Sequence, residues 1–409
     1  MKRGIDSQEA WFRIVVALVI ASIALASPYV AAVALKQIAE EFGGQRSIPS
    51  AAISLSWLGV GVGGLGMGWV ANRIGVRWTI AWGGLMNLVG LVLASGGSAW
   101  QLYVGFGLFV GLIGNSGINA PLYVYATRWF DGRRGAALAL IASGSYIAGA
   151  LWPPIFEKMI EAYGWRQVMI GFGVVVAATV IPLGLLFLKE PPPLAQPSHG
   201  EHAADPKRER VMGLNRNVAF GLLSVASFLC CVPMAMPQSH LIAFCGDLGF
   251  ASGRGPAMVS LLLICAFMSR QFWGWFSDRI GGLNTLLIGS AAQGLAMLGF
   301  LVTQDEIGLF AVSAFFGLGF AGLIPAYVLA VRQHFPASEA HWRVPGLMLF
   351  SMAGMAFGAW VAGVIYDYAG FYAASFATGL AANVLNFLLL TLLALGQRHQ
   401  RRRSAVVGL

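Results

Sequence analysis

One arginine of this sequence, Arg270, lies deep inside an apolar run, Pro256–Phe276. A cation inside a membrane span is costly and is normally retained for function. Its planar guanidinium can bind a carboxylate through two parallel hydrogen bonds, so we predict that Arg270 binds a small organic anion. The alternative is a structural arginine paired with a buried acid or a helix terminus. Ala266 occupies the position one turn earlier, which makes a fixed internal partner less favoured.

Two further ionisable residues, His240 and Asp247, stand seven residues apart near the end of another apolar run, Val218–Leu241. On a regular helix they share a face two turns apart. A carboxyl group that alternates between a nearby cation and a desolvated site can take up and release a proton, and histidine titrates near neutral pH. We predict that they couple proton movement to transport. A packing histidine and a helix-capping aspartate are the alternatives. Pro233 and Pro237 lead us to expect a flexible or broken helix here.

A stripe of polar residues in a third apolar run repeats at helical spacing. Asn115, Asn119 and Tyr123 are separated by four residues each, so they share one face, which lipid would exclude. We expect this face to line a central cavity, with interhelical bonding as the alternative. Weaker candidates for substrate binding are Tyr29, Tyr146, Gln238, Tyr327 and Ser351.

The elements that position these residues are membrane helices. The 409 residues are 57% hydrophobic and only 11% charged, whereas soluble domains carry about 25% charged residues. Apolar runs of about 20 residues can cross a hydrocarbon core, and the first is too long for the apolar part of a signal peptide. The predicted spans are Trp11–Leu35, Ala51–Ala71, Trp78–Ala94, Leu102–Val124, Ala136–Phe156, Val168–Leu188, Val218–Leu241, Pro256–Phe276, Leu283–Val302, Ile307–Val331, Val344–Tyr366 and Phe371–Leu395.

The basic residues concentrate in the segments on one side of these spans. With both termini cytoplasmic, the opposite side keeps only Lys36, Arg46, Lys158, Arg166 and Arg254. This asymmetry follows the positive-inside rule, so the net charge of +9 reflects topology and no nucleic-acid partner is expected. We predict a multi-pass protein of the cell inner membrane, a monomer with both termini in the cytoplasm.

A proline-rich, charged segment divides the chain into two similar halves. We predict a six-helix bundle over residues 1–188, a cytoplasmic linker over 189–216 and a second bundle over 217–409. The motif Gly68–Gly75 recurs as Gly274–Gly281, an offset of 274 − 68 = 206 residues, which indicates a duplicated fold. Each copy pairs a polar residue with an arginine at a helix end. We expect Asn72, Arg73, Asp278 and Arg279 to help close the cytoplasmic side.

This duplicated motif resembles the Gly-x-x-x-Asp-Arg-x-Gly loop of the major facilitator superfamily, with Asn72 in place of an aspartate. The stretch Arg128–Ser145 looks like the fifth-helix signature of the monocarboxylate and oxalate:formate transporter families. Gln238–Leu241 with Asp247–Gly249 is similar to the seventh-helix ending of their bacterial members. The resemblance implies two pseudo-symmetric bundles of six transmembrane helices. It also implies proton-linked symport of lactate-like or pyruvate-like monocarboxylates, with Arg270 on the carboxylate and Asp247, with His240, carrying the proton.

Other functions remain open at this point. Exchange of two organic anions and a ligand sensor with a carrier fold are the alternatives. No Lys or Arg occurs in Val344–Tyr366, so a second charge for a dianion is missing there. The spans show no nucleophile and base cluster, so we expect no enzyme, and no cofactor or metal beyond the coupling proton. Four cysteines, Cys230, Cys231, Cys245 and Cys265, lack metal-site spacing and are interpreted as packing residues.

Overall fold

A computed structural model describes residues 6–130, 133–188 and 210–407 of the chain. Within these ranges, twelve helical segments are long and apolar enough to cross a membrane, which confirms the predicted all-α membrane fold. Each begins within four residues of its prediction, but several end later. The fifth, for example, extends to Tyr163 and not to Phe156. Hydropathy misses this last part because Glu157, Lys158 and Glu161 lower the apolar character of helix that still continues.

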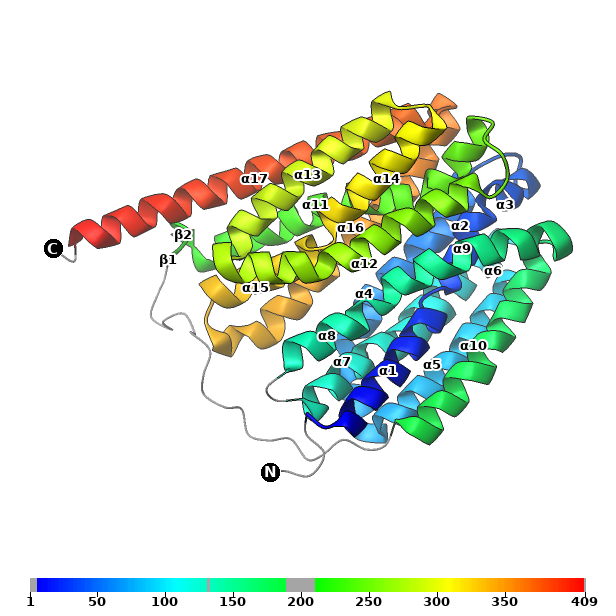
Figure 1. Ribbon diagram of the computed structural model, residues 1–409, viewed down its shortest axis with the longest axis horizontal. Helices are drawn as coiled ribbons and strands as arrows, with labels where there is room; N and C mark the ends of the chain where they lie inside the picture. The colour runs from blue at the N-terminus through cyan, green and yellow to red at the C-terminus, as the bar shows by residue number, and fades with distance from the viewer. Residues whose placement is uncertain (1–5, 131–132, 189–209, 408–409) are drawn as a thin grey trace.

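The helices form two bundles that follow each other along the chain (Figure 1). The N-terminal bundle contains α1 (Gln8–Ala24), α2 (Ser27–Val33), α3 (Leu35–Glu41), α4 (Ser47–Ile74), α5 (Val76–Ala94), α6 (Ala99–Val104), the π-helix η1 (Gly105–Asn115), α7 (Ser116–Trp129), α8 (Arg134–Ala142), α9 (Gly144–Tyr163) and α10 (Trp165–Phe187). The C-terminal bundle contains β1 (Arg210–Val211), β2 (Leu214–Asn215), α11 (Arg216–Asp247), α12 (Arg254–Ile280), α13 (Gly282–Val302), α14 (Glu306–Phe320), α15 (Leu323–His334), the 3-10 turn η2 (Ala337–Glu339), α16 (Ala340–Ala369) and α17 (Tyr372–Val407).

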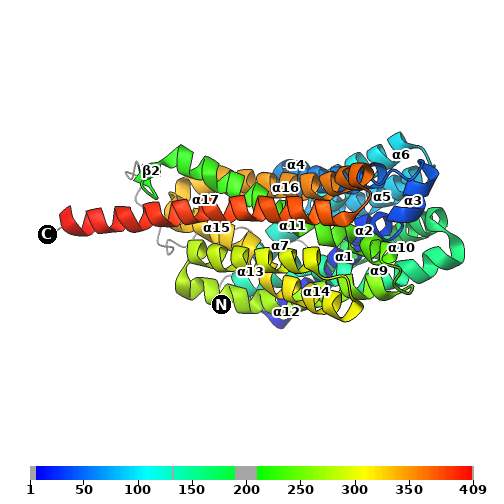
Figure 2. The same ribbon diagram turned by 90° about the horizontal axis from the view of Figure 1, so that it is seen from above.

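The molecule has two ends, and the two bundles lie closer together at one end than at the other. We call the end at which α1 begins and α17 ends the terminal end, and the opposite end the distal end. The long helix α17 projects beyond the other helices at the terminal end (Figure 2). The ribbons of the two halves lie close together toward the distal end and separate toward the terminal end (Figure 1). Residues 189–209 of the predicted linker lie outside the described residues, and the described part of that linker begins at the hairpin β1–β2.

Two pairs of helices carry most of the contact between the halves. Helix α4 packs against α16, and α9 packs against α12. Small residues permit the close approach: a Cβ on Gly363 of α16 would lie 2.4 Å from the hydroxyl of Ser50, and one on Gly61 of α4 would lie 2.7 Å from the Met352 side chain. The α4–α16 contact therefore extends from the distal end to the middle of the helices.

Several spans contain a break that the sequence did not reveal. The fourth predicted span is divided into α6, the π-helix η1 and α7. Glycines on η1 bring its backbone against neighbouring helices, since a Cβ on Gly111 would lie 2.5 Å from the Ser56 carbonyl oxygen. A π-helical stretch inside an α-helix is uncommon and often marks a functional region. The break ends at Asn115, the first residue of the predicted polar stripe.

The expectation of a broken seventh span is wrong. Helix α11 continues without interruption from Arg216 through Pro233 and Pro237 to Asp247. The two prolines lack backbone N–H donors, but most of the helix is buried against α16, α17 and α12. This packing stabilises the continuous helix. The Gln238 side chain also donates to the Met234 carbonyl oxygen at 2.9 Å, which secures the backbone beside Pro237.

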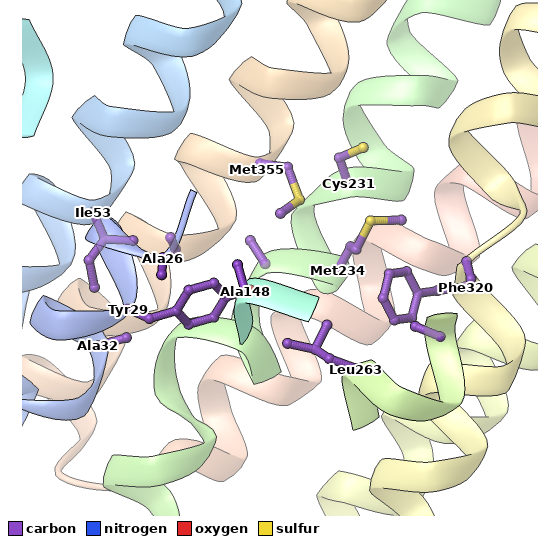
Figure 3. Packing of buried hydrophobic residues seen from close by; sticks show 14 of the residues in the cluster. Ala26, Tyr29, Ala32, Ile53, Ala148, Cys231, Met234, Leu263, Phe320 and Met355 are labelled. Carbon is purple, nitrogen blue, oxygen red and sulfur yellow. The ribbon is translucent and has the colours of Figure 1, made fainter. Parts of the chain in front are cut away.

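The middle of the molecule is an apolar layer contributed by both halves. Figure 3 shows Tyr29 of α2 pointing toward Ala148 of α9 and Leu263 of α12, with Met234 and Met355 on the far side. These side chains are buried, and they belong to one continuous core. The same region contains the candidate site described next.

Candidate functional site

Arg270 lies well inside helix α12. It follows the first residue of that helix, Arg254, by sixteen positions and precedes the last, Ile280, by ten. At about 1.5 Å per residue, it lies roughly 24 Å from the distal end of the helix and 15 Å from the terminal end. The prediction of a cation deep within a span therefore agrees with the helix boundaries of the structure.

The partners of Arg270 are aromatic and come from the other half. Its guanidinium carbon lies 5.3 Å from the ring centroid of Tyr146 on α9. It also interacts electrostatically with the hydroxyl groups of Tyr146 and of Tyr123 on α7. Among the described residues Arg270 forms no salt bridge, and it remains half-buried. An uncompensated cation of this kind is available to an anionic ligand.

Tyr146 connects this cation to the contact between the halves. The Tyr29 hydroxyl interacts with Tyr146. A Cβ on Gly149 of α9 would lie 2.5 Å from the Tyr29 hydroxyl and 2.2 Å from the Leu263 side chain of α12. Beside Tyr146, a pocket of about 270 Å³ has an apolar lining formed by α9 and α12. A guanidinium, phenolic hydroxyls and apolar surface thus adjoin one another between the two bundles.

The other residues predicted to bind substrate have partners elsewhere or none among the described contacts. Asn115 is buried with its side-chain oxygen unpaired, and Asn119 is half-buried. Tyr327 is buried and donates to Asn386 at 2.8 Å, whereas Ser351 is buried against Ser227 and donates to the Leu347 carbonyl. The Gln238 side chain is turned back onto its own helix. Their roles in substrate binding stay predictions.

Asp247 is the last residue of α11, at the distal end of the molecule, whereas Arg270 lies well inside α12. Its two carboxylate oxygens accept hydrogen bonds of 2.6 Å each from the guanidinium of Arg46, and the Lys36 ammonium lies 3.1 Å away. Arg46 and Lys36 belong to the N-terminal half, so this cluster joins the two halves. Asp247 is thus beside a cationic arginine, but that arginine is Arg46 and not Arg270.

Arg46 is held more firmly than its position in the α3–α4 connection suggests. Its guanidinium carbon lies 3.6 Å from the ring centroid of Tyr366 and 5.1 Å from that of Tyr372, and only 6% of the residue is exposed. Burial lowers the pKa of Arg46, but the hydrogen bonds to Asp247 and the neighbouring Tyr372 phenol outweigh it, so the net shift is upward. The guanidinium is therefore charged at every physiological pH.

His240 lies two turns before Asp247 and is fully buried. Its Nε2 lies 2.8 Å from the Ala359 carbonyl oxygen, and its Nδ1 lies 3.0 Å from the Tyr372 hydroxyl. A carbonyl can only accept, so Nε2 carries the proton and Nδ1 accepts from the tyrosine. The Ser50 hydroxyl of α4 lies 3.4 Å from Nε2. This histidine therefore ties α11 to α16 and α17 beside the Arg46 cluster.

The residues of the repeated motif lie at the terminal end, each with contacts in its own half. Asn72 accepts a 2.9 Å hydrogen bond from Arg128, and the guanidinium of Arg73 stacks over Trp69. Arg279 stacks over Trp275, and it lines a cavity of about 620 Å³ together with Asp278 and residues of α17 and the hairpin. Their role in closing the terminal end stays a prediction.

Several residues of the distal cluster were not identified from the sequence. Arg46 is separated by 321 positions from Asp367, whose neighbours in the chain include Tyr366 and Tyr372, and only folding brings Arg46 to them. The available signal was the scarcity of cations on the distal side, where Arg46 is one of five. Within the described ranges, no cluster of three potential metal ligands occurs, and three of the four cysteines are buried.

Comparison with known proteins agrees with this architecture. A family model described as Major Facilitator Superfamily matches residues 15–341 and 246–408. Monocarboxylate transporter 13 of Bos taurus is 24% identical over 338 residues, covering 80% of this chain and 75% of the relative. The MFS-type transporter pynF of Aspergillus niger is 24% identical with 76% and 72% covered, and the uncharacterized MFS-type transporter YcxA of Bacillus subtilis is 24% identical with 73% and 74% covered.

Solved transporter structures have the same fold. A bacterial homolog of the human lysosomal transporter Spinster, in an inward-facing and unoccupied conformation, superposes with a TM-score of 0.65 at 15% identity, covering 96% of this chain and 98% of that one. A POT family transporter in complex with 5-aminolevulinic acid gives a TM-score of 0.71 at 12% identity, covering 94% and 96%. At these identities the likeness concerns the fold alone.

Proposed function

We propose that this chain, which belongs to the Major Facilitator Superfamily, is a secondary active transporter of small organic anions. More specifically, we propose that it is a proton-coupled monocarboxylate symporter. The observation that carries the proposal is Arg270, a cation deep in a span with aromatic neighbours and without a carboxylate partner among the described residues. One guanidinium neutralises one carboxylate, which favours a monoanion.

The neighbours of Arg270 fit such a substrate. The hydroxyl groups of Tyr146 and Tyr123 supply donors beside the guanidinium, and the apolar pocket lined by Tyr146 can receive a short hydrocarbon body. Ligand sites commonly combine apolar walls with a few convergent polar groups. Tyr146 and Tyr29 belong to the N-terminal half and Arg270 to the C-terminal half, so a bound anion would contact both halves.

The proton is assigned to Asp247, with His240 beside it. When the distal end is closed, Arg46 occupies both carboxylate oxygens, so Asp247 is ionised. Opening the distal end would withdraw Arg46 and Lys36, and an isolated carboxylate takes up a proton more readily. Renewed closure would displace that proton. His240 lies two turns deeper on the same helix.

Alternating access then follows from the two-bundle fold. The positive-inside asymmetry favours a cytoplasmic terminal end with both termini in the cytoplasm, and we assign the chain to the inner membrane on this basis. The structure, with its distal end closed by contacts between the halves, would correspond to an inward-facing state. Anion and proton would bind from the distal side, and rocking of the halves would release both to the cytoplasm. The carrier would work as a monomer.

The test is uptake into proteoliposomes. Uptake of labelled lactate or pyruvate would be driven by an inside-alkaline pH step without internal anion, with protein-free liposomes as the control for diffusion of the free acid. Symport predicts accumulation in this assay and its loss in Arg270→Lys, because an ammonium cannot reproduce the planar fork. Organic anion exchange is the rival, and it would require internal anion. Binding without uptake would instead favour a sensor.

A further inference from the structure

We infer that two symmetry-related latches hold the distal end closed, in each of which an acid near the end of one helix contacts the residues at the start of a helix from the other half. The first latch joins Asp367 of α16 to the start of α4. The second joins Glu161 and Glu157 of α9 to the start of α12. These residues act as gating residues for the transport cycle, and their assignment extends the proposed function to the step that opens the distal side.

The first latch is a carboxylate bound to two backbone amides. Asp367 accepts from the backbone N–H of Arg46 at 2.7 Å with one oxygen and from that of Ser47 at 3.0 Å with the other. The first amides of a helix have no partner within the helix and carry partial positive charge, so they favour an anion. Here the anion comes from a helix 320 positions away in the sequence, in the other half of the molecule.

The second latch repeats this arrangement with the halves exchanged. The Ser252 hydroxyl donates to Glu161, and the Glu157 carboxylate lies beside Gly253, the residue that precedes α12. Gly253 has φ of +90°, which leaves space and freedom for this approach. Both glutamates belong to α9 of the N-terminal half, whereas α12 belongs to the C-terminal half.

The internal repeat relates the two latches residue by residue. Subtracting the motif offset of 206 from 367 gives 161, and adding 206 to 46 gives 252. Asp367 therefore corresponds to Glu161, and Arg46 corresponds to Ser252. The helix ends follow the same offset, because α9 and α16 end at Tyr163 and Ala369. A contact kept in both copies of a duplicated fold, in two different chemical forms, points to a shared role.

The latches differ in strength. The first has the additional guanidinium of Arg46, which reaches Asp247 with two 2.6 Å hydrogen bonds and stacks on Tyr366. Ser252 and Glu161 are exposed, so water can replace their contact. Every one of these contacts crosses between the halves, and all of them must break when the distal ends separate. A contact made only in the closed state stabilises that state by the free energy of the contact. The first latch should therefore contribute more than the second to keeping the distal end closed.

A thiol at Ser54 can report this opening. Ser54 is 7% exposed and lies one turn beyond Ser50 on the face of α4 that meets α16. We would measure the rate at which a water-soluble charged thiol reagent modifies Ser54→Cys in lipid nanodiscs, subtracting the rate of the parent chain with its native cysteines. Asp367→Ala and Glu161→Ala would each be combined with this reporter.

Asp305→Ala is the matched control. Asp305 also caps a helix at the distal end, accepting from Gly308 of α14 at 2.7 Å, but both residues belong to the C-terminal half. We expect Asp367→Ala to raise the modification rate about tenfold or more, the effect of losing charge-assisted hydrogen bonds made only in the closed state, and Glu161→Ala to raise it less. Asp305→Ala should leave it unchanged. Equal rates in all three variants would overturn the inference.

Folding is checked separately by gel filtration and circular dichroism of each variant. Should Asp367→Ala fail to fold, Asp367→Asn keeps the shape of the side chain but removes its charge and turns an amide donor toward one of the two backbone N–H groups, so it must raise the rate in its place; an unchanged rate there would also refute the latch. The readout requires neither a monocarboxylate nor a pH gradient. A wrong substrate assignment would therefore leave these results intact, and a wrong latch would leave the Arg270 experiments intact.

Discussion

Replacing Asp247 by asparagine tests the proton assignment with little change of shape. Asparagine keeps one acceptor oxygen but turns an amide donor toward Arg46, so one of the two 2.6 Å charge-assisted hydrogen bonds is lost, together with the attraction of Lys36. A hydrogen bond to a charged group contributes ~1.5–3 kcal/mol. The larger loss of about 3–5 kcal/mol that follows breaking a fully buried pair is not expected, because 24% of the Asp247 side chain is exposed.

This loss has two measurable consequences. At about 1.4 kcal/mol per factor of ten, the open state of the distal end gains roughly 10- to 150-fold in relative population. More importantly, the position can no longer take up a proton. A pH step of two units supplies ~2.7 kcal/mol, so one-to-one symport can accumulate a monocarboxylate about 100-fold in the parent protein.

The assay is uptake of labelled pyruvate into proteoliposomes at an inside-alkaline step of two pH units, followed by counterflow with internal unlabelled pyruvate. Asp247→Asn should abolish accumulation and retain counterflow, since the anion site at Arg270 is untouched. Accumulation equal to that of the parent chain would refute the coupling role of Asp247. Loss of counterflow as well would show that the residue supports the transport cycle in general and not the proton alone.

Four further substitutions test other parts of the structure. Tyr146→Phe removes the hydroxyl beside Arg270 and should raise KM several-fold with little change in maximal rate; an unchanged KM would exclude that hydroxyl from the site. Gly358→Ala places a Cβ 2.1 Å from a backbone oxygen of α11 and should destabilise the protein by ~1–3 kcal/mol, whereas Gly274→Ala, with no neighbour within 4 Å, should be neutral or stabilising in thermal unfolding. His240→Ala removes the donor to the Ala359 carbonyl and the acceptor of the buried Tyr372 hydroxyl, and should lower stability by about 1–3 kcal/mol; an unchanged unfolding temperature would contradict its bridging geometry.

The sequence was sufficient for the membrane architecture because the signals are local. Apolar runs of spanning length, the offset of 206 residues and the isolated charge of Arg270 are visible without knowledge of tertiary contacts. The helix breaks were missed for the opposite reason. The π-helix η1 depends on close approach to α4, and the continuity of α11 through two prolines depends on packing against α16 and α17.

The partners of the charged residues could not be predicted at all. Asp247 and Arg46 are separated by 201 positions, and His240 contacts Tyr372 across 132 positions. Spacing along one helix correctly placed His240 and Asp247 two turns apart but gave no indication that the cation beside Asp247 comes from the other half. The repeat could have pointed to Asp367, since its counterpart Glu161 lies on the distal side near Arg166, but only the structure shows what both acids contact.

Binding of a monocarboxylate to Arg270 is the claim on which the transport proposal depends. Isothermal titration of the purified protein with pyruvate and with its uncharged methyl ester, in the parent chain and in Arg270→Lys, measures it directly. We predict that pyruvate binds the parent chain, that the ester does not, and that Arg270→Lys weakens pyruvate binding at least about tenfold. Equal affinity of the parent and the variant for pyruvate, or equal binding of acid and ester, would contradict the assignment.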